Sequence, residues 1–377
     1  MSKNRLIVIA AGGTGGHLFP AEALATTLKR LHVRTVLATD GRVDEMTGTF
    51  PAESVVTIPS ATPSVGSVLD KAKAAVQLGR GFLAASSFLR RLRPDCVVGF
   101  GGYPTVPPVM AAAMLGIPTI IHEQNGVVGR ANRFLMRRVT AIATGFAHVG
   151  GLPVDLARKA YHTGSPVRPA VLVAAERAFS PLEPGGTLQL LVFGGSQGAR
   201  VMSDVVPAAI VSLSPEERAR LHVVQQARPE DIESVRRRYA EAGIRAEIEA
   251  FFSDLPARIA ASHLIVSRSG ASTVAELGVI GRPSILVPLP GAIDRDQAAN
   301  ARSLAEIGAA TVIPQPDFTP KRLAAELRVR LDEPARLTEA AAAAKSAGIT
   351  DASERLAAIV MSLGHIDVAD ATAEIHA

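Results

Sequence analysis

Two glycine clusters in this sequence have the composition of loops that hold phosphate groups. The first follows an apolar run in LIVIAAGGTGGHLFP, residues 6–20, and the second follows another in LQLLVFGGSQGAR, residues 188–200. Glycines allow a backbone to turn sharply and to approach a ligand closely. A helix that begins after such a loop directs free N–H groups and the positive end of its dipole at an anion. The sequence therefore predicts two strand–loop–helix units that each face an anionic ligand.

The first cluster matches neither of the common nucleotide-binding motifs. The spacing G-x-G-x-x-G fails because Gly13 and Gly15 are followed by Leu18, and the G-K-[ST] of a P-loop is absent. Pro20 suits the first turn of a helix, so the glycines should form a strand-to-helix loop with His17 at its mouth. His17 is therefore a candidate for catalysis or binding. The alternatives are a tight turn without a ligand and a histidine that only packs.

The second cluster also satisfies the G-x-S-x-G pattern of a serine nucleophile, through Gly194, Ser196 and Gly198. A serine hydrolase is therefore a rival interpretation. It leaves the first glycine cluster unexplained, and no clear histidine partner stands late in the chain. His263 begins an apolar run, which favours a structural role for it.

Polar residues also follow several other apolar runs. The segment HEQN, residues 122–125, follows PTII, and Gln297 follows VPLPG. Ligands of open α/β sheets bind at the carboxyl ends of strands, so both are candidates for a site, with a solvated loop as the alternative for HEQN. Glu276 lies early in a predicted helix. A carboxylate there can accept two ribose hydroxyl groups, or it can be a surface acid that stabilises the helix dipole.

Short apolar runs alternate with helical stretches along the chain, a pattern typical of a parallel sheet wrapped by helices. Near-continuous Val, Ile and Leu is typical of buried parallel strands. The predicted strands are residues 6–11, 34–39, 95–100, 118–123 and 141–146 in the first half, and 188–194, 221–226, 246–251, 263–268 and 284–289 in the second. We therefore predict an α/β protein with two Rossmann-like, doubly wound parallel-sheet domains that face one cleft.

The boundary between the domains should fall where proline and glycine are frequent. GSPVRPAV and SPLEPGG, which lie between residues 164 and 186, are the best candidates. We expect a first domain over residues 1–165 and a second over 166–350. A helix over 351–363 should pack back on the first domain, and residues 364–377 should form a tail.

Composition excludes several classes of protein. The chain has 377 residues, of which 47% are hydrophobic and 20% charged, so it should be globular. Its one cysteine, Cys96, excludes an internal disulfide and a cysteine-based metal site, and it suits a reducing compartment. We see no signal-peptide pattern at the start and no uncharged apolar run of about 18 residues, so we expect a soluble or peripheral protein.

Charge is distributed unevenly along the chain. Residues 1–170 hold 19 Lys and Arg against 9 Asp and Glu, a net +10, whereas the rest of the chain holds 21 against 26, a net −5. A basic first half predicts an anionic partner such as a phosphorylated substrate or a lipid surface. Nucleic acid is not expected, because three tyrosines and no tryptophan make a poor platform for stacking bases.

Residues 68–95 combine apolar side chains with a cationic rim. Apolar residues with such a rim fit a helix that lies on an anionic membrane, and a helix whose apolar side packs on the core is the alternative. The residues concerned are Val68, Leu69, Ala72, Val76, Phe82 and Leu83, with Lys71, Lys73, Arg80, Arg90, Arg91 and Arg93 among them.

The motifs GGTGGH, FGGYPTVP, HEQNG, GSPVR, GGSQGA, SRSGASTVAE and D-R-x-Q occur in this order along the chain. Together they resemble the MurG family, the bacterial peptidoglycan glycosyltransferases that turn lipid I into lipid II, over residues 5–360. The resemblance implies a GT-B-type fold. The first domain would receive the lipid-linked acceptor and dock, as a peripheral protein, on the cytoplasmic face of the inner membrane. The second would hold UDP-N-acetylglucosamine for inverting transfer to the 4-hydroxyl of a muramyl sugar.

The resemblance also implies roles for residues at matching positions. His17, Tyr103 and Glu123 resemble catalytic or acceptor-side residues, and Glu276 resembles the acid that binds the ribose. The other implied substrate contacts are Thr14, Gly15, Gly16, Asn125, Arg168, Ser196, Gln197, Gly198, Ala271, Ser272 and Gln297.

The implied chemistry needs one base, one oriented acceptor hydroxyl and stabilisation of a departing diphosphate. A helix N-terminus after GGSQGA can stabilise the leaving UDP without a metal. We therefore expect neither a metal nor a cofactor, and Ser196 would be a donor contact rather than a nucleophile. His17 and Glu123 are both candidates for the base.

Two positions depart from the family pattern. Phe252 stands where the family often has an isoleucine whose backbone reads the uracil, and Asp296 stands where it often has the first of two glutamines. The implied partners are UDP-N-acetylglucosamine, the undecaprenyl-diphosphate-linked muramyl-pentapeptide, an anionic inner-membrane surface and other proteins of cell-wall synthesis. A nucleotide-sugar-binding protein without enzyme activity is a third interpretation, which predicts binding without turnover.

Overall fold

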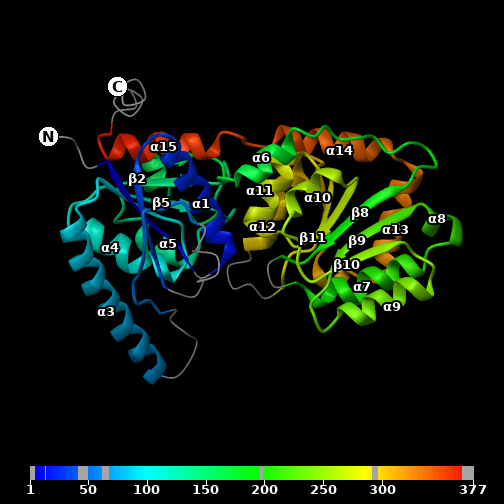
Figure 1. The fold of residues 1–377 in the computed structure, drawn as a ribbon, viewed down its shortest axis with the longest axis horizontal. Helices are drawn as coiled ribbons and strands as arrows, with labels where there is room; N and C mark the ends of the chain where they lie inside the picture. Colours follow the sequence, from blue (N-terminus) through cyan, green and yellow to red (C-terminus); the bar gives the residue numbers. More distant parts are fainter. Residues whose placement is uncertain are drawn as a thin grey trace. The chain divides into compact units, whose positions relative to one another are not determined.

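The computed structural model describes residues 5–12, 14–40, 50–61, 68–195, 198–290 and 296–366 (Figure 1). The chain divides into two compact units. The first unit comprises Met1–Arg168 and Thr350–Ala377, and the second comprises Pro169–Ile349. The chain therefore passes from one unit to the other twice, once after Arg168 and once before Thr350.

The first unit is built on a seven-stranded parallel sheet with the order β3-β2-β1-β4-β5-β6-β7. In this sheet Ile9 pairs with Leu37 on one side and with Val98 on the other. The strands are β1 Leu6–Ala10, β2 Arg34–Thr39, β3 Ser54–Thr57, β4 Cys96–Gly99, β5 Thr119–Glu123, β6 Ala141–Thr144 and β7 Ala160–His162.

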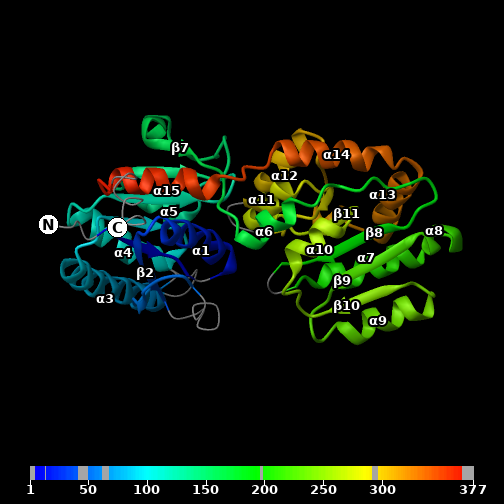
Figure 2. The same ribbon diagram turned by 45° about the horizontal axis from the view of Figure 1, so that its top comes forward.

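Both faces of this sheet are covered by helices (Figures 1 and 2). Side chains of a strand alternate between faces, so Ile7 and Ile9 join the core under α1 and α15, while Leu6 and Val8 join the core under α3, α4 and α5. The helices are α1 Gly15–Arg30, α3 Val68–Leu92, α4 Val106–Met114, α5 Arg130–Leu135 and α15 Ala352–Leu363, with the 3-10 segments η1 Tyr103–Thr105 and η2 Val154–Lys159. The last helix, α15, contacts α1 and β4.

The second unit is built on a six-stranded parallel sheet with the order β10-β9-β8-β11-β12-β13. Its strands are β8 Leu188–Phe193, β9 Leu221–Gln226, β10 Ala246–Glu249, β11 Leu264–Ser267, β12 Ser284–Leu286 and β13 Ala310–Val312. Its helices are α6 Pro169–Ala175, α7 Arg200–Val211, α8 Pro215–Ala219, α9 Ile232–Glu241, α10 Leu255–Ala261, α11 Ala271–Ile280, α12 Asp296–Glu306, α13 Pro320–Asp332 and α14 Ala335–Ser346, with η3 Gln315–Asp317.

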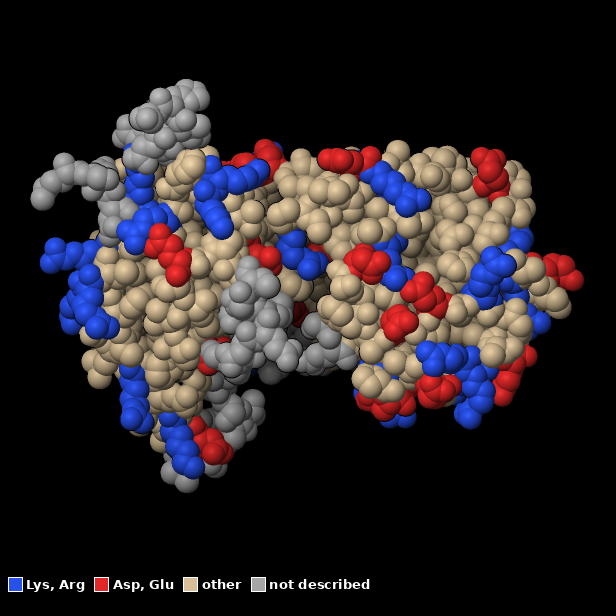
Figure 3. Space-filling view, in the orientation of Figure 1, with Lys and Arg blue, Asp and Glu red and all other residues tan. Residues whose placement is uncertain are grey.

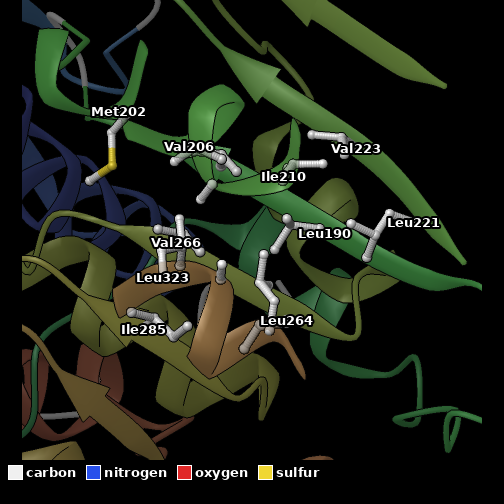
Figure 4. Packing of buried hydrophobic residues seen from close by; sticks show 14 of the residues in the cluster. Leu190, Met202, Val206, Ile210, Leu221, Val223, Leu264, Val266, Ile285 and Leu323 are labelled. Atoms are coloured by element: carbon white, nitrogen blue, oxygen red, sulfur yellow. The ribbon is translucent and has the colours of Figure 1, made fainter. Parts of the chain in front are cut away.

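The core of the second unit contains side chains from its strands and from the helices on the sheet (Figure 4). Leu190 and Val266 of neighbouring strands meet Met202 and Ile210 of α7, and Leu323 of α13 packs into the same cluster. The residues of this cluster are almost fully buried, as expected for strands that are covered by helices.

The predicted α/β class with two parallel sheets is confirmed, and each of the ten predicted strands coincides with an observed one to within a few residues. The strands β3, β7 and β13 were not predicted; they are short and none is fully buried. Within the segment expected as a linker, residues Pro169–Ala175 form α6. Among the described residues, no helix combines the length and the hydropathy that crossing a bilayer requires.

Candidate functional site

The first glycine loop connects β1 to α1 in the first unit. Helix α1 begins at Gly15 after the N-cap Thr14, and the backbone N–H groups of His17 and Leu18 donate to the Thr14 carbonyl. A side chain at Gly12 would lie 2.9 Å from Thr39 Oγ1, so any larger residue there would force its neighbours to shift. Gly13 lies outside the described residues. Gly15 is buried, whereas Thr14 and Gly16 are exposed at the start of the helix.

The imidazole of His17 lies at the carboxyl edge of this sheet. Its Nδ1 is 3.0 Å from the hydroxyl oxygen of Thr14. The ring lies against the turn after β4, because a methyl group at Gly101 would come 3.4 Å from His17 Nε2 and one at Gly102 would come 3.4 Å from Cε1. Burial lowers the pKa of His17 to about 4. The ring is therefore neutral near pH 7, and it can accept a proton.

Tyr103 follows Gly101 and Gly102, which have φ angles of 83° and 71° and so occupy a region that favours glycine. The Thr105 hydroxyl donates to the Gly102 carbonyl over 2.8 Å and closes this turn. The half-buried Tyr103 ring packs against the core under α3, α4 and α5. Tyr103 thus directly follows the glycine turn that His17 contacts.

Glu123 ends β5 and is only 2% exposed. Its Oε1 accepts from the backbone and side-chain amides of Asn125, at 3.0 and 3.3 Å. Its Oε2 accepts from the Gly129 backbone at 2.9 Å and from Asn132 Nδ2 at 2.8 Å. Burial raises the pKa of Glu123, and these donors oppose the rise. Both oxygens are occupied in holding the loop between β5 and α5, so the arrangement favours a positioning role.

Arg168 is the last residue of the first unit. Its guanidinium carbon lies 4.0 Å from the centre of the Phe19 ring, in the first turns of α1. Burial raises the pKa of Glu22, and the positive charge of Arg168 opposes that rise. The structure thus brings Arg168 to the helix that carries His17. Asn125, which lies in the loop held by Glu123, is half-buried.

In the second unit, the second glycine loop connects β8 to α7. A side chain at Gly194 would collide with the backbone nitrogen of Ala199 at 2.2 Å, and Gly195 and Gly198 have φ angles of 91° and 68°. The loop therefore requires glycine at three positions before α7 begins at Arg200. Ser196 and Gln197 lie outside the described residues.

Helix α11 begins at Ala271, after the N-cap Gly270, and carries the half-buried Ser272 in its first turn. Glu276, one turn further on, is buried. The alternative of a surface acid is therefore wrong for Glu276.

Gln297 lies in α12, beside the start of α11. Its Oε1 accepts from the Leu289 backbone at 3.0 Å, and its backbone carbonyl accepts from the Ser269 hydroxyl at 2.8 Å. The amide oxygen of Gln297 is thus occupied in holding the segment after β12, which leaves its Nε2 group as the donor that could meet a ligand.

The rival hydrolase interpretation needs a histidine near the second glycine loop. The second unit contains two histidines, His222 and His263. His222 lies at the start of β9 and His263 immediately precedes β11, and both hydrogen-bond Gln189 at the start of β8. This is the amino edge of the sheet, opposite to Gly194 at its carboxyl edge. Neither histidine can serve a nucleophile in the glycine loop of this unit.

Three residues in these networks were not predicted as site residues: Phe19, Asn132 and Gln226. Phe19 stacks on Arg168, Asn132 donates to Glu123, and Gln226 accepts from the Gly194 backbone at 3.0 Å. Phe19 lies inside a motif that the sequence singles out, whereas only the strand pairing brings Gln226 to the glycine loop. Within the described ranges, no group of three His, Cys, Asp or Glu side chains is arranged to hold a metal ion.

Comparison with known proteins covers both units. Residues 7–144 match the glycosyltransferase family 28 N-terminal domain, and residues 189–356 match the glycosyltransferase family 28 C-terminal domain. A protein of Methylorubrum extorquens is 60% identical over 94% of this chain and 96% of its own length. It is named UDP-N-acetylglucosamine–N-acetylmuramyl-(pentapeptide) pyrophosphoryl-undecaprenol N-acetylglucosamine transferase. A relative of the same name from Methylobacterium nodulans is 61% identical over 94% of this chain and 96% of its own length.

Solved structures agree with this relationship. The crystal structure of Acinetobacter baumannii MurG superimposes with a TM-score of 0.77 at 27% identity, and the match covers 95% of this chain and 99% of that one. The glycosyltransferase of kitacinnamycin, at 18% identity and a TM-score of 0.65, shares the fold over 95% of this chain and 98% of its own. The chain is therefore a glycosyltransferase that belongs to family 28 and, within that family, to the MurG family.

Proposed function

We propose that this protein transfers N-acetylglucosamine from UDP-N-acetylglucosamine to the 4-hydroxyl of the muramyl sugar in undecaprenyl-diphosphate-linked muramyl-pentapeptide, with inversion. This reaction converts lipid I to lipid II. The observation that carries the proposal is the 60% identity, over 94% of the chain, to a transferase whose name states this donor and this acceptor. The residues at the carboxyl edges of the two sheets support the roles proposed for the base and for donor binding.

The acceptor hydroxyl needs a base, and His17 is the better candidate of the two. With Nδ1–H donating to the Thr14 hydroxyl over 3.0 Å, Nε2 carries the lone pair. The low pKa of about 4 keeps the ring unprotonated before the substrates bind. As the bond from O4 to the sugar C1 forms, Nε2 takes the hydroxyl proton, and the bond from C1 to the diphosphate oxygen breaks with its electron pair on UDP.

Glu123 acts on this reaction through other residues. It is buried, and its carboxylate oxygens already accept four hydrogen bonds. Asn132, one of the donors, lies beside the turn at Gly101 that His17 also contacts, because a methyl group at Gly101 would come 3.5 Å from Asn132 Nδ2. Glu123 is therefore proposed to position the loop that carries Asn125 next to the acceptor.

The donor is proposed to bind at the carboxyl edge of the second sheet. Backbone N–H groups at the N-termini of α7 and α11 would stabilise the charge that develops on the leaving UDP. The ribose would lie at Glu276 and the uracil at the backbone of Phe252, with Gln297 Nε2 donating to the sugar. The other proposed substrate contacts are Thr14, Gly15, Gly16, Tyr103, Asn125, Arg168, Ser196, Gln197, Gly198, Ala271 and Ser272.

Peripheral attachment to the cytoplasmic face of the inner membrane is proposed for the surface of α3. Val76 is 63% exposed and Leu83 68% exposed on this helix. The half-buried ring of Phe82 packs on the core, so the alternative of a core-facing residue fits this position. Lys and Arg side chains line the helix in Figure 3, and the exposed ones are Lys73, Arg80, Arg90 and Arg91. The side chains of Val68, Leu69 and Lys71 lie outside the described part.

UDP release from UDP-N-acetylglucosamine, with and without a lipid I analogue, tests the proposed function. Acceptor-dependent release by the wild type is expected, as is a loss of kcat in His17→Ala with donor binding intact. Labelling of Ser196 by a serine-reactive probe, without acceptor-dependent release, would favour a hydrolase. Binding of the sugar nucleotide without turnover, in the presence of a competent acceptor, would favour a binding protein.

A further inference from the structure

We infer that Gln226 is a positioning residue that couples the second glycine loop to the segment after β10, and that it thereby sets both the affinity for UDP and the selectivity for its base. The inference rests on the proposed function, because it takes the diphosphate to lie at the glycine loop and the uracil at Phe252. Its own basis is a pair of hydrogen bonds that one side chain makes to two separate segments.

Gln226 is the last residue of β9, and β9 lies between β8 and β10 in the sheet. Gly194 directly follows β8, and Ala250 directly follows β10. The Gly194 backbone N–H donates to Gln226 Oε1 over 3.0 Å, and Gln226 Nε2 donates to the Ala250 carbonyl over 3.1 Å. A single side chain on the middle strand therefore joins the two loops that continue its neighbours.

The two contacts require a primary amide. One partner is a backbone donor and the other is a backbone acceptor, so the side chain must accept at one end and donate at the other. Glutamate of the same length can accept from Gly194 but cannot donate to Ala250. Gln226 is only 7% exposed, so water is poorly placed to replace a lost bond, and an unmade bond is costly there.

The segment after Ala250 is also held at its other end. The guanidinium carbon of Arg258 lies 4.4 Å from the centre of the buried Phe252 ring. The same guanidinium forms ion pairs of 2.7 Å with Glu247 of β10 and 2.7 Å with Asp254 before α10. Phe251, between the two anchors, is 67% exposed. Gln226 therefore controls the end of this segment that faces the glycine loop, and Arg258 controls the other end.

This arrangement has a consequence for how the ligand binds. The Gly194 N–H is already used by Gln226 and the Gly198 N–H by the Gly195 carbonyl. Of the described residues, Gly195 and the first turn of α7 would therefore supply the N–H groups that meet the anion. Their position relative to the base-binding segment follows from the length of the Gln226 side chain. Loss of the bridge should therefore weaken the binding of UDP, which carries both a base and a diphosphate, more than it lowers the stability of the second unit.

The test is the dissociation constant for UDP and for ADP, measured by calorimetry, in wild type, Gln226→Glu and Gln226→Met. The glutamate side chain still accepts from the Gly194 N–H. The methionine side chain keeps the volume but makes neither the bond to Gly194 nor the bond to Ala250. We expect the constant for UDP to rise about tenfold in each variant and the preference for UDP over ADP to fall. Gln189→Met is the matched control, because Gln189 lies in the same sheet but near its amino edge, and it should leave both quantities unchanged.

The other outcomes separate the inference from the proposed function. If the variants bind UDP with the wild-type dissociation constant and the wild-type preference over ADP, the inference alone is overturned. Weaker UDP binding with an unchanged preference over ADP would also overturn the inference alone. Failure of the wild type to bind UDP would overturn the proposed function, and the inference with it. If neither variant folds, hydrogen exchange in the wild type decides: inorganic pyrophosphate, which has no base, should slow exchange at Ala250–Phe252, and unchanged exchange there would overturn the coupling.

Discussion

His17 Nδ1 lies 3.0 Å from the hydroxyl oxygen of Thr14, the N-cap residue of the same helix. The pairing leaves Nε2 as the atom that can take a proton, provided that Nδ1 carries the hydrogen. Thr14→Val keeps the shape of the side chain and removes this acceptor. We expect kcat to fall about tenfold, the usual effect of losing one positioning hydrogen bond. Thr14→Ser should keep most of the activity, and full kcat in the valine variant would contradict the pairing.

The pH profile of the reaction should also report on His17. Burial lowers its pKa to about 4, so the neutral form needed for the base persists well below neutrality. We expect kcat/KM for the acceptor, which reports the free enzyme, to stay level on acidification and to fall only as the pH approaches about 4. An acid limb near the ordinary histidine pKa of about 6.5 would show that the free enzyme does not hold His17 in this environment.

Glu123 should matter more for stability than as a proton acceptor. Glu123→Ala would leave the Gly129 N–H and the Asn125 and Asn132 amides without their acceptor in a buried loop. We expect a loss of about 3–5 kcal/mol in the free energy of unfolding, measured with urea. Asp155→Asn breaks an exposed ion pair with Arg137 and should cost less than about 1 kcal/mol. Equal costs in the two variants would show that the Glu123 network does not stabilise the fold.

Much of the fold could be predicted because buried parallel strands are continuous apolar runs that end in glycine or polar residues. β1 and β8 show this, and both glycine loops follow from it. β7, Ala160–His162, could not be predicted, since three residues with little apolar character leave no periodic signal and only pairing with β6 identifies the strand.

The site could be predicted less completely than the fold. As candidates, His17 and Glu276 follow from their places beside predicted loops. The proposed roles of His17 as the base and Glu123 as a positioning residue could not be predicted, because the second depends on donors that the folded loop brings to Glu123 from as far along the chain as Asn132. Gln226 was beyond prediction for the same reason, since its partners Gly194 and Ala250 are distant in sequence.

Vesicle binding should depend on the exposed apolar side chains of α3. The double variant Val76→Ser/Leu83→Ser removes two side chains that are mostly exposed, so folding should be unaffected. Burial of such a side chain contributes roughly 1.5–3 kcal/mol, and we expect sedimentation with vesicles of anionic lipid to fall about tenfold or more. Activity on a soluble acceptor analogue should be retained.

A matched control for this variant lies in the second unit. Val173→Ser/Val211→Ser removes two exposed valines from α6 and α7 and should leave vesicle binding unchanged. If the α3 variant binds vesicles as well as the wild type, α3 does not attach the protein to lipid and the alternative, a helix that only packs on the core, holds.

Arg282 should be among the most sensitive positions in the second unit. It is fully buried, and its hydrogen-bond partners in the part of the chain that the structure describes are backbone carbonyls rather than a carboxylate. Its Nη2 donates to Arg177 O and Ala260 O at 2.9 and 2.6 Å, and its Nη1 donates to Ile280 O and Gly281 O at 3.0 Å each. One guanidinium thus joins the segment after α6 to the carboxyl ends of α10 and α11, where helix dipoles favour a cation.

Lysine cannot reproduce this arrangement, because an ammonium has three donors at one point and not a planar fork. Burial lowers the pKa of Arg282 to about 10, so the group stays charged at neutral pH and its loss would show little pH dependence there. We expect Arg282→Lys to lower the free energy of unfolding by about 3–5 kcal/mol. Arg236→Lys, at an exposed ion pair with Glu233, should change it by less than about 1 kcal/mol. If the two substitutions cost the same, the carbonyl cluster around Arg282 does not hold these three segments together.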